Sequence, residues 1–299
     1  MLAWNVLVVL WGAYVRASGS GAGCGSHWPL CNGEVLPVAP RLGTIIEFTH
    51  RLMSGVALAG VIALWLWSRA SFPRGHRVRK MALASFLLLI VEALLGAGLV
   101  LFNYVGNNAS VGRAFYLALH LVNTLLLLGA LALAAWYSGG VASARGHRSS
   151  GMSSWITAAL PIAALVSVTG AIAALGDTLF PSATLAQGFH QDFSGAANFL
   201  IRLRILHPGL AILAACYFVA VSIFVLRSTP YPTARNLAVS VLILAVIQLG
   251  AGATNVLLLA PVAMQITHLL LADLLWIALV LLAVEASPLR APRLAAKLH

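Results

Sequence analysis

Residues 112–137 read GRAFYLALHLVNTLLLLGALALAAWY, with Arg113 as the only charged side chain and His120 as the only histidine. A helix needs about 20 apolar residues to cross a lipid bilayer, so this stretch predicts a membrane span. Seven further stretches share its character: about 1–17, 45–68, 80–102, 153–175, 200–226, 234–258 and 262–286. The predicted fold class is therefore an all-α integral membrane protein with eight transmembrane helices.

The composition supports this class. Of 299 residues, 61% are hydrophobic and 8% are charged, and the mean hydropathy is +0.96. A soluble domain carries roughly a quarter charged residues. The net charge of +11 would suit a nucleic-acid-binding protein. The basic residues, however, stand at helix ends and in short loops, where they set membrane topology, so no nucleic-acid partner is expected.

The basic residues are distributed unequally between the two ends of the predicted spans. Loops 2–3, 4–5 and 6–7 and the C-terminal tail hold twelve of the 18: Arg69, Arg74, Arg77, Arg79, Lys80, Arg145, Arg148, Arg227, Arg235, Arg290, Arg293 and Lys297. The opposite ends hold six: Arg16, Arg41, Arg51, Arg113, Arg202 and Arg204. The positive-inside rule places the richer side, and with it both termini, in the cytoplasm.

The third and seventh spans contain similar segments. Residues 91–98 read VEALLGAG, and residues 246–252 read VIQLGAG. Small residues allow membrane helices to approach closely, which alone would explain the glycines. Each segment also lies between two spans that contain a histidine, and this repeated order favours duplication. The sequence thus predicts two pseudo-symmetric four-helix bundles, residues 1–138 and 139–299.

Each even-numbered span contains one histidine: His50, His120, His207 and His268. Each lies 5–9 residues into its span, which is about 8–13 Å at 1.5 Å per residue. All four are predicted to share one layer near the outer face. Ionisable groups inside a membrane are costly and usually functional, so we expect ligands. Paired imidazoles in an apolar bundle suit haem iron better than zinc or copper and predict two haem sites.

A di-iron carboxylate site is the alternative metal centre. Such a site needs the Glu-x-x-His motif twice together with two further glutamates. The chain supplies the motif once, in Glu47-Phe48-Thr49-His50. The haem interpretation is therefore preferred.

Charges beside the histidines differ between the two halves. Glu47 lies three residues before His50, on the same helix face, and a carboxylate there suggests proton handling. Arg204 takes the matching position before His207 and suggests a contact with a haem propionate. The alternative interpretations are a Glu47–Arg51 pair one helical turn apart and arginines that extend toward the membrane surface. Further candidates for propionate contacts are Arg51 and Arg202.

Cys24 and Cys31 lie in the first outer loop. On the oxidising side of a membrane they predict a disulfide that closes a short loop, or a pair that exchanges electrons with a partner. A zinc site would lack a full set of ligands.

Several motifs together resemble the haem A synthases. They are Gly12-Ala13-Tyr14-Val15-Arg16, the segment GCGSHWPLC at 23–31, Glu47-Phe48-Thr49-His50-Arg51, His120, His207-Pro208-Gly209, and Asn255 through Pro261 leading to His268. The resemblance covers nearly the whole chain.

This resemblance implies a bacterial plasma-membrane enzyme that oxidises the C8 methyl of haem O to a formyl group, giving haem A for cytochrome oxidase. The family suggests successive hydroxylations of the methyl followed by loss of water. By analogy, His50 and His120 hold the substrate haem, Glu47 is the catalytic carboxylate, and His207 and His268 hold a haem b cofactor. The outer cysteines match the family's disulfide or redox pair. Implied partners are an electron donor or acceptor, haem O synthase, cytochrome oxidase assembly factors and, in a homo-oligomer, further copies of the chain.

Two other functions fit a di-haem membrane protein. One is a quinol-oxidising electron-transfer subunit of the cytochrome b kind, and the other is a haem carrier. Four histidines in the outer half of the membrane disfavour electron flow across it. A transporter would more typically interrupt its helices at the midplane.

Overall fold

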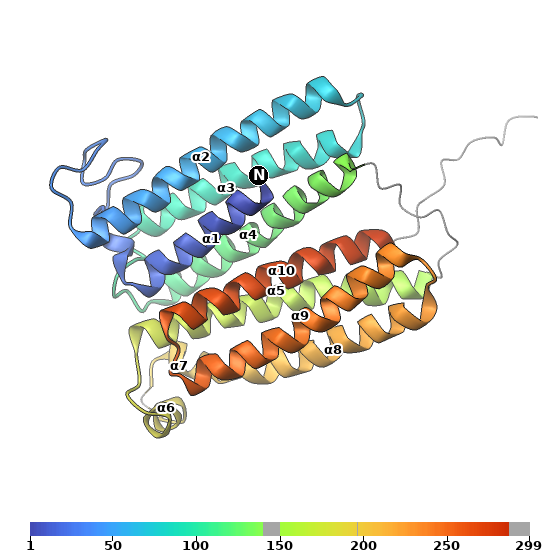
Figure 1. The fold of residues 1–299 in the computed structure, drawn as a ribbon. Coiled ribbons are helices and arrows are strands. Elements are labelled where there is room, and N and C mark those ends of the chain that lie inside the picture. Colours follow the sequence, from blue (N-terminus) through green and yellow to red (C-terminus); the bar gives the residue numbers. More distant parts are fainter. Residues whose placement is uncertain (140–149, 196, 287–299) are drawn as a thin grey trace, which may run out of the picture.

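The computed structural model describes residues 1–139, 150–195 and 197–286, and these parts form a bundle of helices without β-strands (Figure 1). The helices are α1 (Leu2–Ala17), the 3₁₀ helix η1 (Ser20–Ala22), α2 (Leu42–Ser71), α3 (Arg77–Leu101), α4 (Val111–Ser138), α5 (Ser150–Leu179), α6 (Leu185–Asp192), α7 (Phe199–Arg204), α8 (Leu206–Ser228), α9 (Pro232–Leu257) and α10 (Val262–Ala286).

Seven helical segments of the described chain are long and apolar enough to cross a membrane: α2, α3, α4, α5, α7 with α8, α9 and α10. A multi-pass membrane protein is confirmed, but the predicted count of eight spans is not. The first apolar stretch forms α1, which has 16 residues. At 1.5 Å per residue it covers about 24 Å, less than the roughly 30 Å of a hydrocarbon core.

The sixth predicted span is interrupted near its start, between α7 and α8 at Ile205. Pro208 has no amide hydrogen for a bond to the carbonyl of Arg204, and its ring crowds that carbonyl. The hydropathy pattern predicted one continuous span at 200–226. The connection before it also contains the short helix α6, whose start is capped by the Thr184 hydroxyl accepting from the amide of Gln187.

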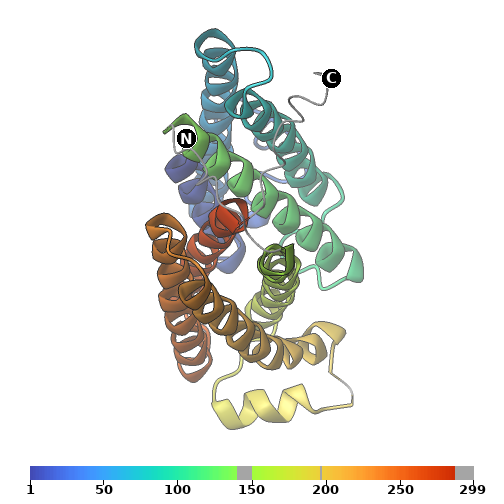
Figure 2. The same cartoon turned by 90° about the vertical axis from the view of Figure 1, so that its right-hand side faces the viewer.

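The long helices pack in two rings. In the first, α1, α2, α3 and α4 each contact two neighbours, and in the second α5, α8, α9 and α10 do the same (Figure 2). Helices α2 and α4 lie diagonally across the first ring, and α8 and α10 lie diagonally across the second. In the described parts of the chain, neither of these diagonal pairs is in extensive contact. The rings follow the order of the predicted halves, with the boundary in the segment 140–149, outside the described residues.

The two rings share a core. Leu125 and Leu128 of α4 belong to the same buried cluster as Leu279 of α10 and Val221 of α8. The indole of Trp276 in α10 donates a hydrogen bond of 2.6 Å to the carbonyl of Leu125. The rings are thus halves of one folded unit.

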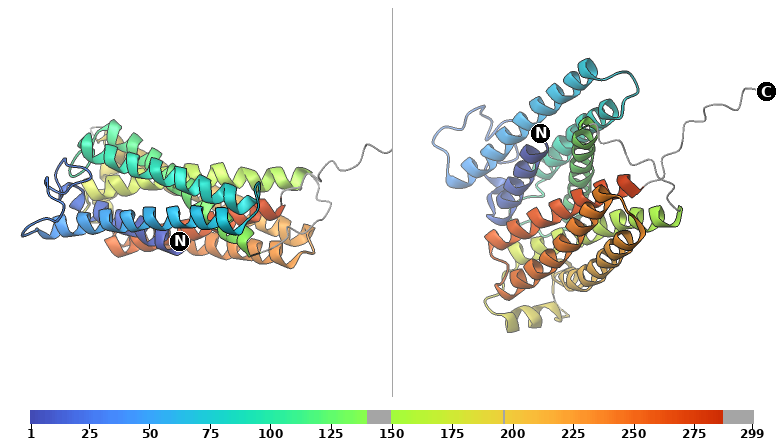
Figure 3. Two further views of the ribbon diagram at one scale, coloured as in Figure 1. Left: turned by 90° about the horizontal axis from the view of Figure 1, so that it is seen from above. Right: turned by 45° about the vertical axis from the view of Figure 1, so that its right-hand side comes forward.

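The connections gather at two ends of the bundle (Figures 1 and 3). Segments 18–41, 102–110, 180–195 with 197–198, and 258–261 lie at one end, which we call the disulfide end. The short turns 72–76 and 229–231 lie at the other, which we call the basic end. Arg145, Arg148, Arg290, Arg293 and Lys297, which contributed to the orientation prediction, lie outside the described residues. The orientation in the membrane thus stays a prediction.

Candidate functional site

The four predicted ligand histidines occupy equivalent positions. His50, His120 and His268 are the ninth, tenth and seventh residues of α2, α4 and α10, and His207 is the ninth residue counted from the start of α7. All these segments begin at the disulfide end (Figure 1). The helices form diagonal pairs, α2 with α4 and α8 with α10, so each pair of histidines belongs to one ring.

Each histidine ring packs against a glycine of a neighbouring helix. A Cβ atom at Gly12 or Gly170 would lie 2.9 Å from the Cε1 atom of the facing imidazole, closer than real Cβ contacts, and one at Gly252 would lie at 3.0 Å, which is tighter than most. At Gly96 the corresponding distance is 3.7 Å, an ordinary van der Waals contact. Glycine therefore makes room for the rings of His50, His207 and His268. The pairs are Gly12–His50, Gly96–His120, Gly170–His207 and Gly252–His268.

These contacts define the register of the internal repeat. An alignment of the two Gly-Ala-Gly segments by letters alone would match Gly98 with Gly252. In the structure Gly96, not Gly98, takes the place of Gly252 beside a histidine, whereas Gly98 faces Tyr116. With this register Glu92 corresponds to Gln248, because each stands four residues before its glycine.

The C-terminal pair has a geometry that suits iron ligation. The ring centroids of His207 and His268 lie 6.4 Å apart, with an angle of 85° between the ring planes. Two imidazole nitrogens about 2 Å from one metal ion would place the centroids roughly 6 Å apart. The Thr169 hydroxyl lies 3.1 Å from the Nδ1 atom of His207 and can fix that ring.

Three of the four rings have a buried Nδ1 atom without a hydrogen-bond partner: those of His50, His120 and His268. A buried polar atom without a hydrogen-bond partner lowers the stability of the fold by about 1–3 kcal/mol. This cost favours a functional role for these rings. The described residues place no group of three His, Cys, Asp or Glu side chains around a metal position. Two paired imidazoles would supply the donor set of a bis-histidine haem.

Glu47 is buried, with 4% of its surface exposed. Its Oε2 accepts a hydrogen bond of 2.8 Å from the amide of Cys24, and its Oε1 accepts one of 2.6 Å from Arg51. The pair one helical turn apart, raised as an alternative for Glu47, is thus present. The carboxylate joins the first turns of α2 to the loop at the disulfide end.

The predicted disulfide between Cys24 and Cys31 is confirmed. Both cysteines are buried, and the loop that they close lies on the start of α2. Arg51 fixes this loop, since its Nη1 donates to the carbonyls of His27 and Leu30 at 2.7 and 2.6 Å. The cysteine segment at 23–31 and the Glu47–Arg51 segment therefore form one structural unit.

The arginines near His207 bind groups of the protein. Arg204 bridges Asp177 of α5, at 2.8 Å from Nη1, and Asp192 of α6, at 2.9 Å from Nε. Arg202 donates to the carbonyl of Gly195 and is exposed. A propionate contact at Arg204 would have to replace or join these carboxylates, so this assignment stays a prediction.

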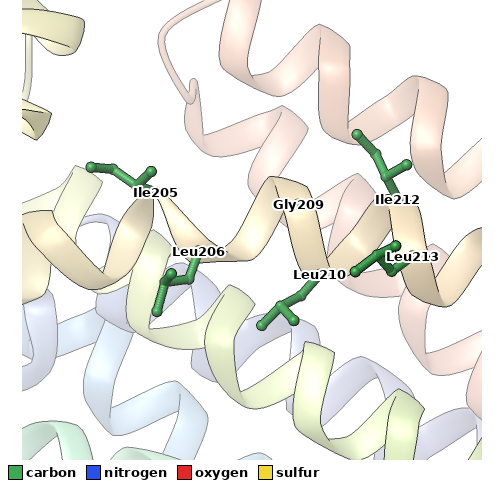
Figure 4. A pocket seen from close by; sticks show the side chains of 6 residues that line it. All are labelled: Ile205, Leu206, Gly209, Leu210, Ile212 and Leu213. Atoms are coloured by element: carbon green, nitrogen blue, oxygen red, sulfur yellow. The ribbon is translucent and has the colours of Figure 1, made fainter.

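An open apolar groove of about 520 Å³ lies on the first turns of α8 (Figure 4). His207 is not among its lining residues, which are Ile205, Leu206, Gly209, Leu210, Ile212 and Leu213. Leu206, Ile212 and Leu213 are all more than half exposed. This surface suits contact with lipid and is separate from the histidine pair.

Sequence reasoning missed three contributors to the site: the glycines that face the histidines, Thr169, and the Glu92–Gln248 correspondence. Glu92 accepts an interhelical hydrogen bond of 2.5 Å on its Oε2 atom from Asn123 Nδ2. The available signal was a polar residue four positions before a glycine, in the spans that precede His120 and His268.

Comparisons with known proteins identify relatives across this architecture. The family model COX15-CtaA, described as "Cytochrome oxidase assembly protein", matches residues 1–280. A Thermus thermophilus protein named "Protoheme IX farnesyltransferase" is 46% identical over 288 residues, which cover 96% of this chain and 47% of that protein. This chain therefore spans about half the length of that curated relative.

Proteins named "Heme A synthase" match over shorter stretches. The one from Alkalihalophilus pseudofirmus is 39% identical over 128 residues, covering 43% of this chain and 40% of that protein. The one from Halalkalibacterium halodurans is 40% identical over 129 residues, covering 42% of each.

Proposed function

The chain belongs to the COX15-CtaA family of cytochrome oxidase assembly proteins, and from this membership we propose that it is a membrane-bound haem A synthase. The reaction is oxidation of the C8 methyl of haem O to a formyl group, and haem A is the product for cytochrome oxidase. Relatives that are 39% and 40% identical carry the name heme A synthase. A long apolar bundle is a suitable site for an apolar macrocycle.

The observation that carries this proposal is the presence of one histidine pair on the diagonal helices of each ring. Two equivalent pairs provide two haem sites. We assign the substrate haem to His50 and His120 in residues 1–138, and a haem b cofactor to His207 and His268 in residues 139–299. When bound, haem b supplies an iron that takes up and passes on single electrons.

The half-reaction fixes what the protein must handle. Conversion of a methyl to a formyl group consumes one water and releases four protons and four electrons. Glu47 is the carboxylate to which we assign proton transfer, because it lies one turn before His50 on α2. Arg51 and the Cys24 amide hold its two oxygens and keep the carboxylate in a fixed position. The electrons require an acceptor, which is a partner of the protein.

The remaining partners and the location follow from the same proposal. A relative named protoheme IX farnesyltransferase contains a region 46% identical to this chain. Addition of a farnesyl chain to protohaem gives haem O, so a farnesyltransferase is the expected source of substrate. We place the protein in a bacterial plasma membrane with the disulfide end and the histidine layer toward the outer face. Both termini then lie in the cytoplasm.

The test is pigment extraction from the full-length protein expressed with a source of haem O, followed by chromatography. We expect formyl-bearing haem together with haem b. Glu47→Ala should abolish the formyl product and retain haem b, whereas His207→Ala should deplete haem b by at least about tenfold, as for loss of an iron ligand.

Two results would contradict the proposal. If haem b alone appears whatever the substrate supply, the protein is an electron-transfer subunit or a carrier. If His207→Ala depletes only the substrate haem, the assignment of the two halves is reversed.

A further inference from the structure

The four candidate ligands differ in the groups beside their Nδ1 atoms. Thr169 offers a hydroxyl to His207, and no side chain hydrogen-bonds Nδ1 of His50 or His268. His120 differs from these three, because its Nδ1 lies 3.4 Å from the Oε1 atom of Glu92. In this ring orientation the two atoms are not hydrogen-bonded, and Nδ1 has no other partner.

The corresponding position in the other ring carries no charge. Gln248 takes the place of Glu92, and its Nε2 lies 3.4 Å from the Nε2 atom of His268. Its Oε1 atom is buried without a partner. The repeat thus places a carboxylate beside one ligand and a neutral amide beside its counterpart.

Glu92 is fixed by the helix that carries His120. Its Oε2 atom accepts a hydrogen bond of 2.5 Å from Asn123 Nδ2, and its Oε1 atom accepts a hydrogen bond from the Thr124 hydroxyl. Asn123 and Thr124 are buried and follow His120 by three and four residues, so all three side chains lie on one face of α4.

Asn123 and Thr124 donate to both oxygens of Glu92, but neither donor carries a charge. Within the described parts of the chain Glu92 forms no ion pair with Lys or Arg. A carboxylate inside a membrane is stable only with polar or charged partners. Nδ1 of His120, 3.4 Å from Oε1 of Glu92, is a further polar atom beside this carboxylate.

We propose that Glu92 is a positioning residue that accepts a hydrogen bond from the Nδ1–H of His120. This bond fixes the tautomer, leaves Nε2 for iron, and raises the basicity of the imidazole, as carboxylates do for metal-bound histidines. A more basic ligand favours the oxidised iron. The inference rests on the proposed function, which assigns the substrate haem to His50 and His120. It implies that the substrate haem is more electron-rich than the cofactor haem.

The test compares Glu92→Gln with Glu92→Asp, which keeps the charge but shortens the side chain by one methylene, in the full-length protein loaded with both haems. The readouts are the midpoint potential and the electron paramagnetic resonance spectrum of each haem. Glu92→Gln should raise the potential of the haem in residues 1–138, leave the other unchanged, and slow formyl formation about 10- to 100-fold. Glu92→Asp should raise the same potential by a smaller amount, because the shorter carboxylate reaches less far toward Nδ1 of His120.

Unchanged potentials and spectra in Glu92→Gln, with both haems bound, would show that Glu92 only packs and would overturn the inference. If that variant does not accumulate, Glu92→Asp decides: a raised potential supports the inference, and no shift overturns it. Absence of haem from residues 1–138 in the unmodified protein would instead overturn the proposed function.

Discussion

Glycine leaves room for an imidazole ring at three places between neighbouring helices, Gly12, Gly170 and Gly252. In a helix interior, alanine is favoured over glycine by about 0.8–1.0 kcal/mol. A glycine at such a place therefore lowers helix stability but leaves space for the ring. Gly170 is the clearest case, since an added Cβ would lie 2.9 Å from Cε1 and 3.3 Å from Nε2 of His207.

Gly170→Ala should therefore weaken haem b binding. Overpacking of this kind costs about 1–3 kcal/mol, or about 5- to 150-fold in affinity. The measurement is the absorbance of haem b per mole of purified protein during titration with haem. Gly250→Ala is the matched control, because a Cβ there meets nothing within 4 Å. Full haem b content in Gly170→Ala would show that His207 does not need this space.

At the scale of elements, apolar length predicts the long helices well. The predicted span at 262–286 agrees with α10, and the other long spans agree within a few residues. Membrane helices satisfy their own backbone hydrogen bonds, so composition alone locates them. The short elements depend on local contacts that no hydropathy pattern contains, such as the Thr184 cap of α6 and the Pro208 break before α8.

The candidate site was predictable only in part, for the same reason. Four histidines at one depth follow from helix starts, and the cysteine pair follows from its loop. The glycines and Glu92 depend on which helices become neighbours. The register of the repeat also depends on contacts, because small residues serve more than one purpose: Gly96 faces His120 as Gly252 faces His268, whereas Gly98 faces Tyr116.

The start of α2 and the disulfide loop act as one element through Arg51. Arg51→Met should leave Glu47 as an unpaired buried charge and destabilise the protein by about 3–5 kcal/mol. The double variant Glu47→Gln with Arg51→Met should recover part of this loss, because no charge is then left unpaired. Thermal unfolding followed by circular dichroism measures both effects.

Arg41→Met is the control for this cycle, since Arg41 is exposed beside the same loop. An Arg51→Met variant as stable as the Arg41→Met variant would show that the pair adds nothing to the loop's attachment. A double variant no more stable than Arg51→Met would show that the unpaired charge of Glu47 is not the cause of the destabilisation.

For the whole molecule, the question is how firmly the two rings are joined. Their shared core is apolar and lies along α4 and α10. At the disulfide end, Arg16 of α1 adds a polar connection to the second ring. It donates to the carbonyl of Ala174 and the hydroxyl of Thr178 on α5, both at 2.8 Å, and to Gln265 of α10 at 2.9 Å.

Arg16→Met should lower stability without separating the halves. A hydrogen bond to a charged group contributes about 1.5–3 kcal/mol, and we expect a total loss of about 3 kcal/mol because methionine still covers apolar surface. Since Trp276 and the leucines of α4 and α10 continue the core, both haems should be released in one cooperative transition at a lower temperature. Thermal scans that follow the Soret band of each haem measure this, with the exposed Arg74→Met at the basic end as the control. Two separate transitions in Arg16→Met would mean that Arg16, rather than the shared core, holds the rings together.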